Sequence, residues 1–240
     1  PTRHREAHVI YYLFRNFFTF VAYEFDNDTF LRALWVDRVM VHVFAGATLA
    51  SLVGYSLLAW MPSFLIRSHG LMVAEAGVYI AATAGALGAV GTWLSGYLTE
   101  RLQRRDIRWA LWLSAAILIA TAPLAVSSFR TRRIGTAFAG PSLAVVHNRV
   151  RPHHRPVASA VLLLSVNCIG LLLGPFAVGA LSQYAFSSHG VDSLRLRYAL
   201  VFIELVSVWA ACHFPWGGSL LALEKRKNFA RRGELSENTL

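Results

Sequence analysis

Long uncharged runs dominate the chain, and they predict helices that cross a membrane. Four stretches contain no Asp, Glu, Lys or Arg, and a fifth contains one acid; the stretches are 39–66, 76–99, 109–129, 156–183 and 198–223. A helix needs about 20 apolar residues to span the hydrocarbon core of a bilayer, which is roughly 30 Å thick. Each stretch reaches that length, so the pattern predicts a spanning helix at each of these places.

A sixth stretch, 134–148, is shorter and contains Pro141, so taken alone it fits a re-entrant segment as well as a span. Loops rich in Lys and Arg stay on the cytoplasmic side of a membrane. The loop 100–108 carries four arginines and the tail 224–240 carries a basic cluster, so both are predicted to be cytoplasmic. An even number of crossings must separate them, which requires 134–148 to cross. One cluster opposes this topology, because it would then lie outside: Arg130, Arg132 and Arg133.

Residues 1–38 have a mixed pattern. The stretch from Val9 to Phe25 is apolar and aromatic, but Arg15 and Glu24 interrupt it. Such a pattern favours a helix lying in the membrane interface over a spanning helix.

The composition agrees with a membrane protein. Hydrophobic residues make up 55% of the 240 residues and charged residues 15%, whereas soluble domains carry roughly 25% charged residues. The formal net charge is +10, but the basic residues form short clusters between uncharged runs. We therefore expect no nucleic-acid partner, which would need the charge on one polar face. Cys168 and Cys212 lie in apolar runs, so the sequence predicts neither a disulfide framework nor a cysteine-based zinc site.

Neither the histidines nor the short motifs indicate an enzyme. His4 and His8 are four residues apart, and a second group comprises His147, His153 and His154, but no Cys or acid accompanies that group. The sequence contains no P-loop, no HExxH motif and no nucleophile elbow. We therefore expect no catalytic residues, no cofactor and no bound metal.

The segment 96–105, GYLTERLQRR, ends an apolar run with a glycine and continues into an acid and three arginines. It resembles the signature loop of the major facilitator superfamily, which follows the second helix of each six-helix half. Glu100 stands where that family usually has Asp, and Gln103 where it has a second Gly. Five positions match the family pattern: Gly96, Leu98, Arg101, Arg104 and Arg105.

The resemblance implies that this loop is a cytoplasmic latch. In the family the acid, here Glu100, accepts hydrogen bonds from a neighbouring helix N-terminus and from arginines in the outward-open state. Both contacts are physically favourable, because a helix N-terminus is partly positive and an arginine donates in a planar fork. A plainer interpretation, compatible with the first, is that the arginines only fix the topology.

Two longer stretches, 51–70 and 140–179, are similar to the seventh helix and to the tenth and eleventh helices of bacterial spinster-like transporters in that superfamily. Residues 193–200 are similar to the start of their last helix. The resemblance implies an all-α polytopic membrane helix bundle, the C-terminal six-helix half of a major facilitator fold. Residues 1–38 would then be a remnant of the central loop. His147 departs from the family pattern, in which glutamine is usual.

The resemblance also implies a function. Such proteins perform secondary active transport of a small organic or amphipathic solute by alternating access, here across the cytoplasmic membrane of a bacterium with the C-terminus inside. The expected partners are the solute, the lipid bilayer and the N-terminal six-helix half of the same carrier. The alternative is a truncated, non-transporting membrane protein that acts only as a helix-packing partner.

Small and polar residues within the spans provide the candidate sites. Small residues allow close helix contact, and proline weakens the helix ladder, so packing or bending is predicted at Gly85, Gly88, Gly170, Gly174 and Pro175. Four polar residues are candidates for the solute pathway: Tyr55, His147, Asn167 and Glu204. For Glu204 the alternative is a carboxyl that faces water or is paired near the outer end of its helix. For Tyr55 and Asn167 the alternative is a purely structural contact between helices.

Overall fold

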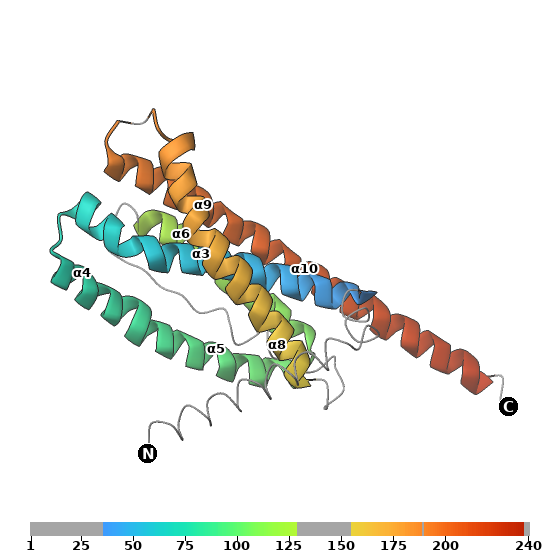
Figure 1. Ribbon diagram of the computed structural model, residues 1–240. Helices are drawn as coiled ribbons and strands as arrows, with labels where there is room; N and C mark the ends of the chain where they lie inside the picture. The colour runs from blue at the N-terminus through green and yellow to red at the C-terminus, as the bar shows by residue number, and fades with distance from the viewer. Residues whose placement is uncertain (1–35, 129–154, 189, 238–240) are drawn as a thin grey trace, which may run out of the picture.

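The computed structural model describes residues 36–128, 155–188 and 190–237, and every regular element among them is a helix. The fold class predicted from the sequence, an all-α membrane helix bundle, is confirmed (Figure 1). The predictions for 1–35 and for 134–148, including His147 and the preceding arginine cluster, lie outside the described residues.

Helix α3 comprises Arg38–His69 and has a defined cap at each end. Asp37 Oδ1 accepts hydrogen bonds from the backbone N–H groups of Val39, at 2.9 Å, and of Met40, at 3.3 Å. Two donors at the start of the helix are thereby satisfied. The helix ends at Gly70, whose φ of 65° is left-handed and whose N–H bonds to the carbonyl of Ile66 at 3.1 Å. A side chain at this position would be strained, which explains the glycine.

The next span is one continuous helical run with an irregular middle. It consists of α4 (Val73–Ile80), the π-helical segment η1 (Ala81–Leu87) and α5 (Gly88–Gln103). A short turn leads to α6 (Arg108–Ser128), where Asp106 Oδ1 accepts from the backbone N–H of Arg108 at 3.0 Å.

The second half of the described chain is also helical. The run α8 (Arg155–Ser165), η3 (Val166–Leu171), α9 (Leu172–Ala180) and η4 (Leu181–Ala185) contains two π-helical segments, η3 and η4. The last element, α10, extends over Asp192–Glu237. It therefore continues beyond the apolar stretch 198–223 into the basic tail, because hydropathy marks the end of the lipid-buried part and not the end of the helix.

Four of these runs are long and apolar enough to cross a membrane: 38–69, 73–103, 158–185 and 192–228. A shorter apolar helix covers 108–123. These positions correspond to the five long uncharged runs of the sequence. Helices are the expected outcome, because a backbone inside lipid must satisfy all of its hydrogen bonds within the segment.

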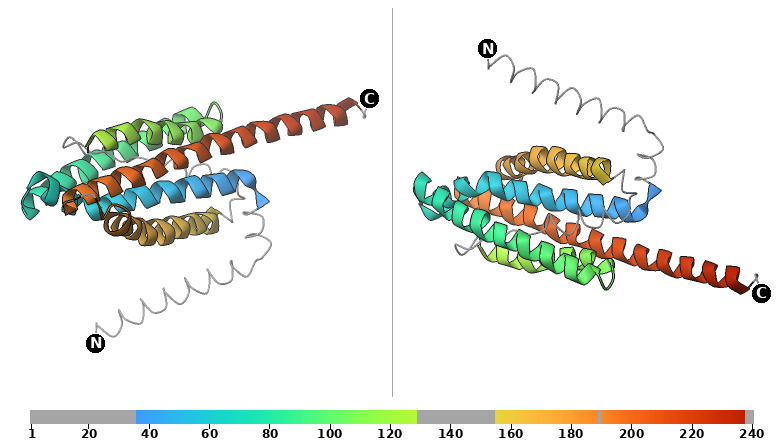
Figure 2. Two further views of the ribbon diagram at one scale, coloured as in Figure 1. Left: turned by 90° about the horizontal axis from the view of Figure 1, so that it is seen from above. Right: turned by 90° about the horizontal axis from the view of Figure 1, so that it is seen from below.

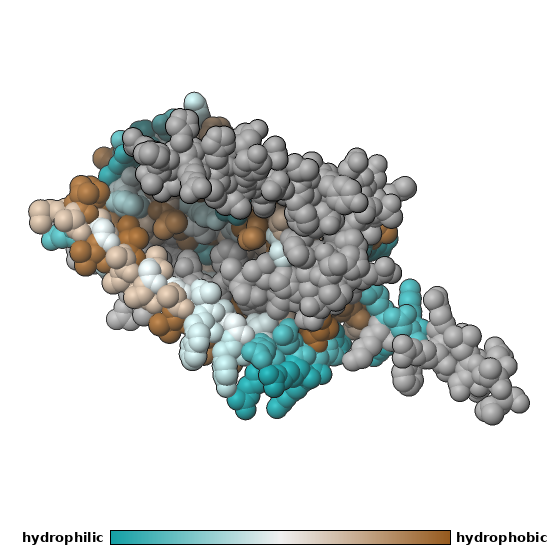
Figure 3. Space-filling model, turned by 60° about the horizontal axis from the view of Figure 1, so that its bottom comes forward, coloured by the Kyte–Doolittle hydropathy of each residue, from teal (hydrophilic) through white to brown (hydrophobic). Residues whose placement is uncertain are grey.

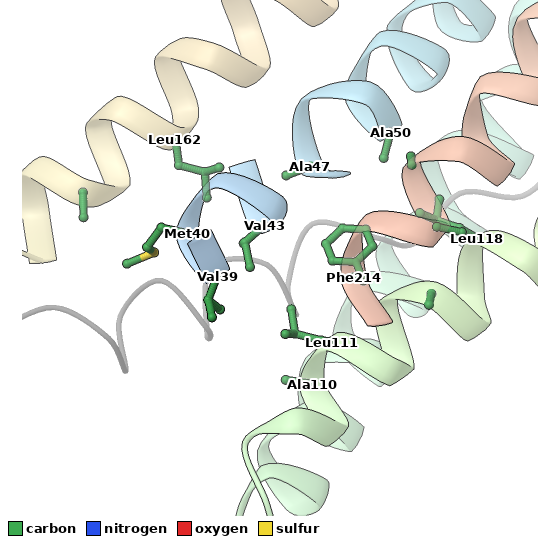
Figure 4. Packing of buried hydrophobic residues seen from close by; sticks show 14 residues of the cluster. Val39, Met40, Val43, Ala47, Ala50, Ala110, Leu111, Leu118, Leu162 and Phe214 are labelled. Atoms are coloured by element: carbon green, nitrogen blue, oxygen red, sulfur yellow. The ribbon is translucent and has the colours of Figure 1, made fainter. Parts of the chain in front are cut away.

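Helices α3 and α10 form the centre of the bundle. Helix α6 packs on the other side of α10, and the run from α8 to α9 packs on the other side of α3 (Figure 2). One core cluster joins α3, α6, α8 and α10 (Figure 4), and its fully buried members include Val43, Leu111, Ala210 and Phe214. A second cluster joins the opposite ends of α3 and α10 to α4 and α9, with Phe64, Val178 and Leu200 at its centre.

The run from α4 to α5 contacts the rest of the described bundle mainly through the turns that lead into and out of it. Its apolar side chains are largely exposed, among them Val78, Val90 and Trp93. Hydrophilic residues gather on the surface at the end of α5, next to hydrophobic residues of the same run (Figure 3). So many exposed hydrophobic side chains on one helical run need lipid or another helix as their surroundings.

Candidate functional site

The structure brings together two of the polar residues predicted to line a pathway. The Tyr55 hydroxyl on α3 donates a hydrogen bond to Oδ1 of Asn167 on η3, with 2.7 Å between the oxygens. Nδ2 of Asn167 donates to the carbonyl of Leu163, one turn earlier, also at 2.7 Å. The amide is thus held in one orientation, with its oxygen toward α3. Asn167 is exposed and Tyr55 is half-buried, so the pair lies at an accessible edge of the contact.

Two glycines allow the backbones of α3 and η3–α9 to approach closely at this point. A Cβ atom on Gly170 would lie 2.9 Å from Cβ of Ser51 and 3.1 Å from Cδ2 of Tyr55. A Cβ atom on Gly174 would lie 2.5 Å from the carbonyl oxygen of Leu52. The predicted packing role of Gly170 and Gly174 therefore has a structural basis. The space around Gly85 is open, whereas Gly88 is buried, and bending at either position stays a prediction.

The helix that carries Asn167 is irregular on both sides of this contact. Pro175 has no N–H and leaves the carbonyl of Leu171 without its usual helical donor, and π-helical segments lie at 166–171 and 181–185. A second side chain of α3 spans the contact, because Nε1 of Trp60 donates to the carbonyl of Pro175 at 2.8 Å. π-Helical turns are frequent at functional sites, where the looser ladder lets a helix bend.

The surroundings of the Tyr55–Asn167 pair are uncharged. No Asp, Glu, Lys or Arg occurs in 39–66 or in 156–185, the two stretches that form the contact. One hydroxyl and one amide on apolar helices can recognise a solute by hydrogen bonds and apolar contact, and they provide no counter-ion. A molecule bound at this contact would be recognised by its shape and by hydrogen bonding.

Glu204 occupies a different interface. It is 4% exposed, so the interpretation that it faces water is wrong. Ser207 donates to Oε1 of Glu204 at 3.0 Å, whereas Oε2 is buried and has no hydrogen-bond partner among the described residues. Glu204 therefore lies on α10, whereas Tyr55 and Asn167 lie on α3 and η3.

Replacing Glu204 with leucine should leave the thermal unfolding temperature unchanged or raise it. The change removes a buried oxygen that lacks a partner, and such an atom costs about 1–3 kcal/mol. Thermal unfolding of the purified chain in detergent measures the effect. The matched variant Ser207→Ala should be less stable, because it removes a hydroxyl that lies 3.0 Å from Oε1 and 2.7 Å from the backbone carbonyl oxygen of Glu204 and donates to both. A lower unfolding temperature for Glu204→Leu would contradict this account.

The predicted signature loop lies at the exposed end of α5. Oε1 of Glu100 accepts from Nη2 of Arg104 at 2.7 Å, and the Tyr97 hydroxyl accepts from Nη1 of Arg101 at 3.1 Å. The acid that binds a helix N-terminus here is Asp106, at the start of α6. Asp106 also pairs with the Arg108 guanidinium at 2.9 Å, and this hydrogen bond raises the pKa of Arg108. The gating role of Gly96, Leu98, Glu100, Arg101, Arg104 and Arg105 stays a prediction.

Replacing Glu100 with glutamine should change the free energy of unfolding by less than about 0.5 kcal/mol, because exposed ion pairs contribute little. The side chains of Arg104 and Glu100 are 75% and 63% exposed, so water screens the pair. Unfolding temperatures of the wild type and the variant measure this effect. A loss of several degrees would mean that Glu100 has a structural role beyond the surface pair.

One polar contact was missed by sequence reasoning. His42 on α3 and His213 on α10 face each other, with 3.0 Å between their Nδ1 atoms. The two residues are 171 positions apart, and no motif connects them. Only the crossing of α3 and α10 brings them together. Within the parts of the chain that the structure describes, no group of three or more His, Cys, Asp or Glu side chains could hold a metal ion.

Comparison with known proteins gives consistent results. The family model of the Major Facilitator Superfamily matches residues 14–175. An MFS-type efflux pump of Mycolicibacterium smegmatis is 32% identical over 185 residues, covering 72% of this chain and 43% of the pump. A probable galactarate/D-glucarate transporter of Pseudomonas putida is 29% identical over 76 residues, covering 32% of this chain and 16% of that protein.

Among solved structures, the fold is similar to that of a bacterial homologue of the human lysosomal transporter Spinster. The inward-facing, unoccupied structure superposes with a TM-score of 0.68 at 24% identity, covering 78% of this chain and 49% of the homologue. The inward-facing, occupied structure gives a TM-score of 0.51 at 22% identity and covers 81% of this chain and 50% of the homologue. The chain therefore spans about half, or less, of the length of the proteins it matches.

Proposed function

The chain belongs to the major facilitator superfamily, and on that premise we propose that it is the C-terminal six-helix half of a secondary active carrier. The carrier would move a small organic or amphipathic solute by alternating access. The match of residues 14–175 to a family of membrane transporters carries this proposal, and it favours a transporter over an enzyme. The fold likeness to a spinster homologue agrees with the resemblance found in the sequence.

We place the solute contact at Tyr55 and Asn167. Their bond joins the first described span to the run α8–η4, and the uncharged surroundings suit an apolar or amphipathic molecule. The π-helical hydrogen bonding of η3, close to Pro175, supports bending of this helical run at the same point. His147 and Glu204 remain candidates for the pathway, with Glu204 buried on α10. The exposed faces of α4, α5 and α8 support a further six-helix partner, the N-terminal half of the carrier.

The native cysteines provide a test that does not require the solute to be known. Cys168 is exposed and follows Asn167 directly, whereas Cys212 is exposed on α10. In bacterial membranes that contain the protein, a membrane-impermeant maleimide should label the Cys212→Ser variant through Cys168. The Cys168→Ser variant, which keeps Cys212, is the matched control. We expect it to react slowly, because the exposed apolar side chains of Val208 and Trp216 flank the remaining thiol and suit a lipid-facing surface.

Alternating access adds a second expectation to this experiment. The labelling rate of Cys168 should change when the membrane is energised, because the side of the carrier open to water changes. Lack of labelling at Cys168, with fast labelling at Cys212, would contradict an aqueous pathway at this contact. The alternative of a non-transporting helix-packing partner would then replace the carrier proposal.

A further inference from the structure

The His42–His213 contact requires the two rings to share a single hydrogen. Their Nδ1 atoms are 3.0 Å apart, and the ring centroids are separated by 5.2 Å. A neutral imidazole carries one N–H and one lone pair, so one Nδ1 atom must donate and the other must accept. Which ring is the donor depends on where the second nitrogen of each ring lies.

The burial of His213 assigns the donor. Nε2 of His213 is buried and has no hydrogen-bond partner among the described residues. If His213 accepted through Nδ1, its hydrogen would sit on Nε2 as a buried N–H without an acceptor, which folded proteins rarely contain. His213 therefore donates through Nδ1. His42 accepts through Nδ1 and carries its own hydrogen on Nε2.

The described side chains that contact the pair are aromatic, and a ring attracts an added positive charge less strongly than a carboxylate does. The Trp216 ring contacts both imidazoles, and the Trp209 ring contacts His213, with centroids 5.6–6.4 Å apart. On α3, Arg38 lies one turn before His42, while Asp37 accepts from two backbone N–H groups at the helix start. On α10, the charged residues nearest to His213 in sequence are Glu204 and Glu224. Helix α6, which packs against α10, begins with Arg108.

We propose that the His42–His213 hydrogen bond is a proton-sensitive clasp between α3 and α10. A proton taken up from solvent onto Nδ1 of His42 removes the lone pair that accepts the bond. The bond can re-form in the opposite direction only if the hydrogen of His213 moves to Nε2, where it has no acceptor. The reversed bond would be charge-assisted, but it would bury a positive charge together with an unpaired Nε2–H on His213. Protonation therefore weakens the contact, and the clasp holds at neutral and alkaline pH and is lost as the pH falls.

The clasp lies at the end of α3 that the first core cluster packs against α6, α8 and α10. His42 lies on the second turn of α3, and the start of α3 packs against α10 and α6 in the first core cluster. Release of the clasp would loosen this end of α3 and leave the second cluster, at the other end, in place. This proposal is independent of which solute is carried.

Nitrogen-15 NMR of histidine-labelled protein in nanodiscs tests the tautomers directly. At pH 7.5 we expect His213 to carry its hydrogen on Nδ1 and His42 to carry its hydrogen on Nε2. The variants His42→Gln and His213→Gln assign the two signals by their disappearance, and each should shift the signal of the partner ring. Hydrogens on Nε2 in both rings, or no effect of one residue on the other, would overturn the proposal.

Thermal unfolding at two pH values tests the clasp itself. Between pH 7.5 and pH 5.5, the wild type should lose about 2–4 °C more than His42→Phe, which keeps an aromatic ring but accepts no hydrogen bond. Cys212→Ser, a change next to His213, should keep the full response of the wild type. Equal losses in the wild type and in His42→Phe would contradict the clasp. Should His42→Phe fail to fold, His42→Gln replaces it: the amide oxygen can accept from His213 but takes up no proton in this range, so this variant should also lack the extra loss of the wild type.

Discussion

Replacing Gly174 with alanine is expected to lower the free energy of unfolding by about 1–3 kcal/mol, the usual range for inserting a group into a packed contact. The added Cβ atom would lie 2.5 Å from the carbonyl oxygen of Leu52 and 2.8 Å from Oγ of Ser56. The first of these atoms belongs to the backbone of α3 and cannot rotate away. The two helices must therefore separate, and Trp60 would lose its alignment with the carbonyl of Pro175.

Thermal unfolding in detergent measures this loss, and Gly77 supplies the matched control. Gly77 lies within α4, and a Cβ atom there would meet nothing within 4 Å. Gly77→Ala should therefore be neutral or slightly stabilising, because alanine is the better helix former. Equal effects of the two substitutions would mean that the close approach of α3 and α9 does not contribute to stability.

Replacing Asn167 with leucine is expected to reduce solute transport about 3- to 20-fold, which corresponds to the roughly 0.6–1.7 kcal/mol of a hydrogen bond between membrane helices. The change removes the acceptor of the Tyr55 hydroxyl at a point where no charged residue can replace it. Tyr55→Phe removes the donor of the same bond. The double variant should lose no more than either single variant, because both changes break one interaction.

Accumulation of the uncharged apolar dye N-phenyl-1-naphthylamine in energised inverted membrane vesicles measures this effect, with the labelling rate of Cys168 as a second readout. Ser219→Ala is the control, because Ser219 is exposed and bonds only to the carbonyl of Pro215 on its own helix. The abundance of each variant in the membrane is matched before comparison. Fully additive losses would show that Tyr55 and Asn167 act separately.

The sequence allowed the helices to be predicted better than their contacts. The uncharged runs predicted helices correctly because lipid leaves a backbone few alternatives. Tyr55 and Asn167 were recognisable as polar residues on apolar helices, but their bond depends on how α3 and η3 cross. The π-helical turns and the burial of Glu204 likewise follow from packing between elements. The His42–His213 pair left no local signal, since neither residue has a partner nearby in sequence.

The central position of α3 and α10 has a consequence for biogenesis. Helix α3 is the first described span to be synthesised and α10 the last described one, so the main interface of the described bundle has to wait until α10 has been made. Until then the side of α3 that α10 will cover must be shielded by lipid, by the insertion machinery or by a chaperone. Contacts so distant in sequence form slowly, which leaves the nascent protein open to proteolysis while it is incomplete.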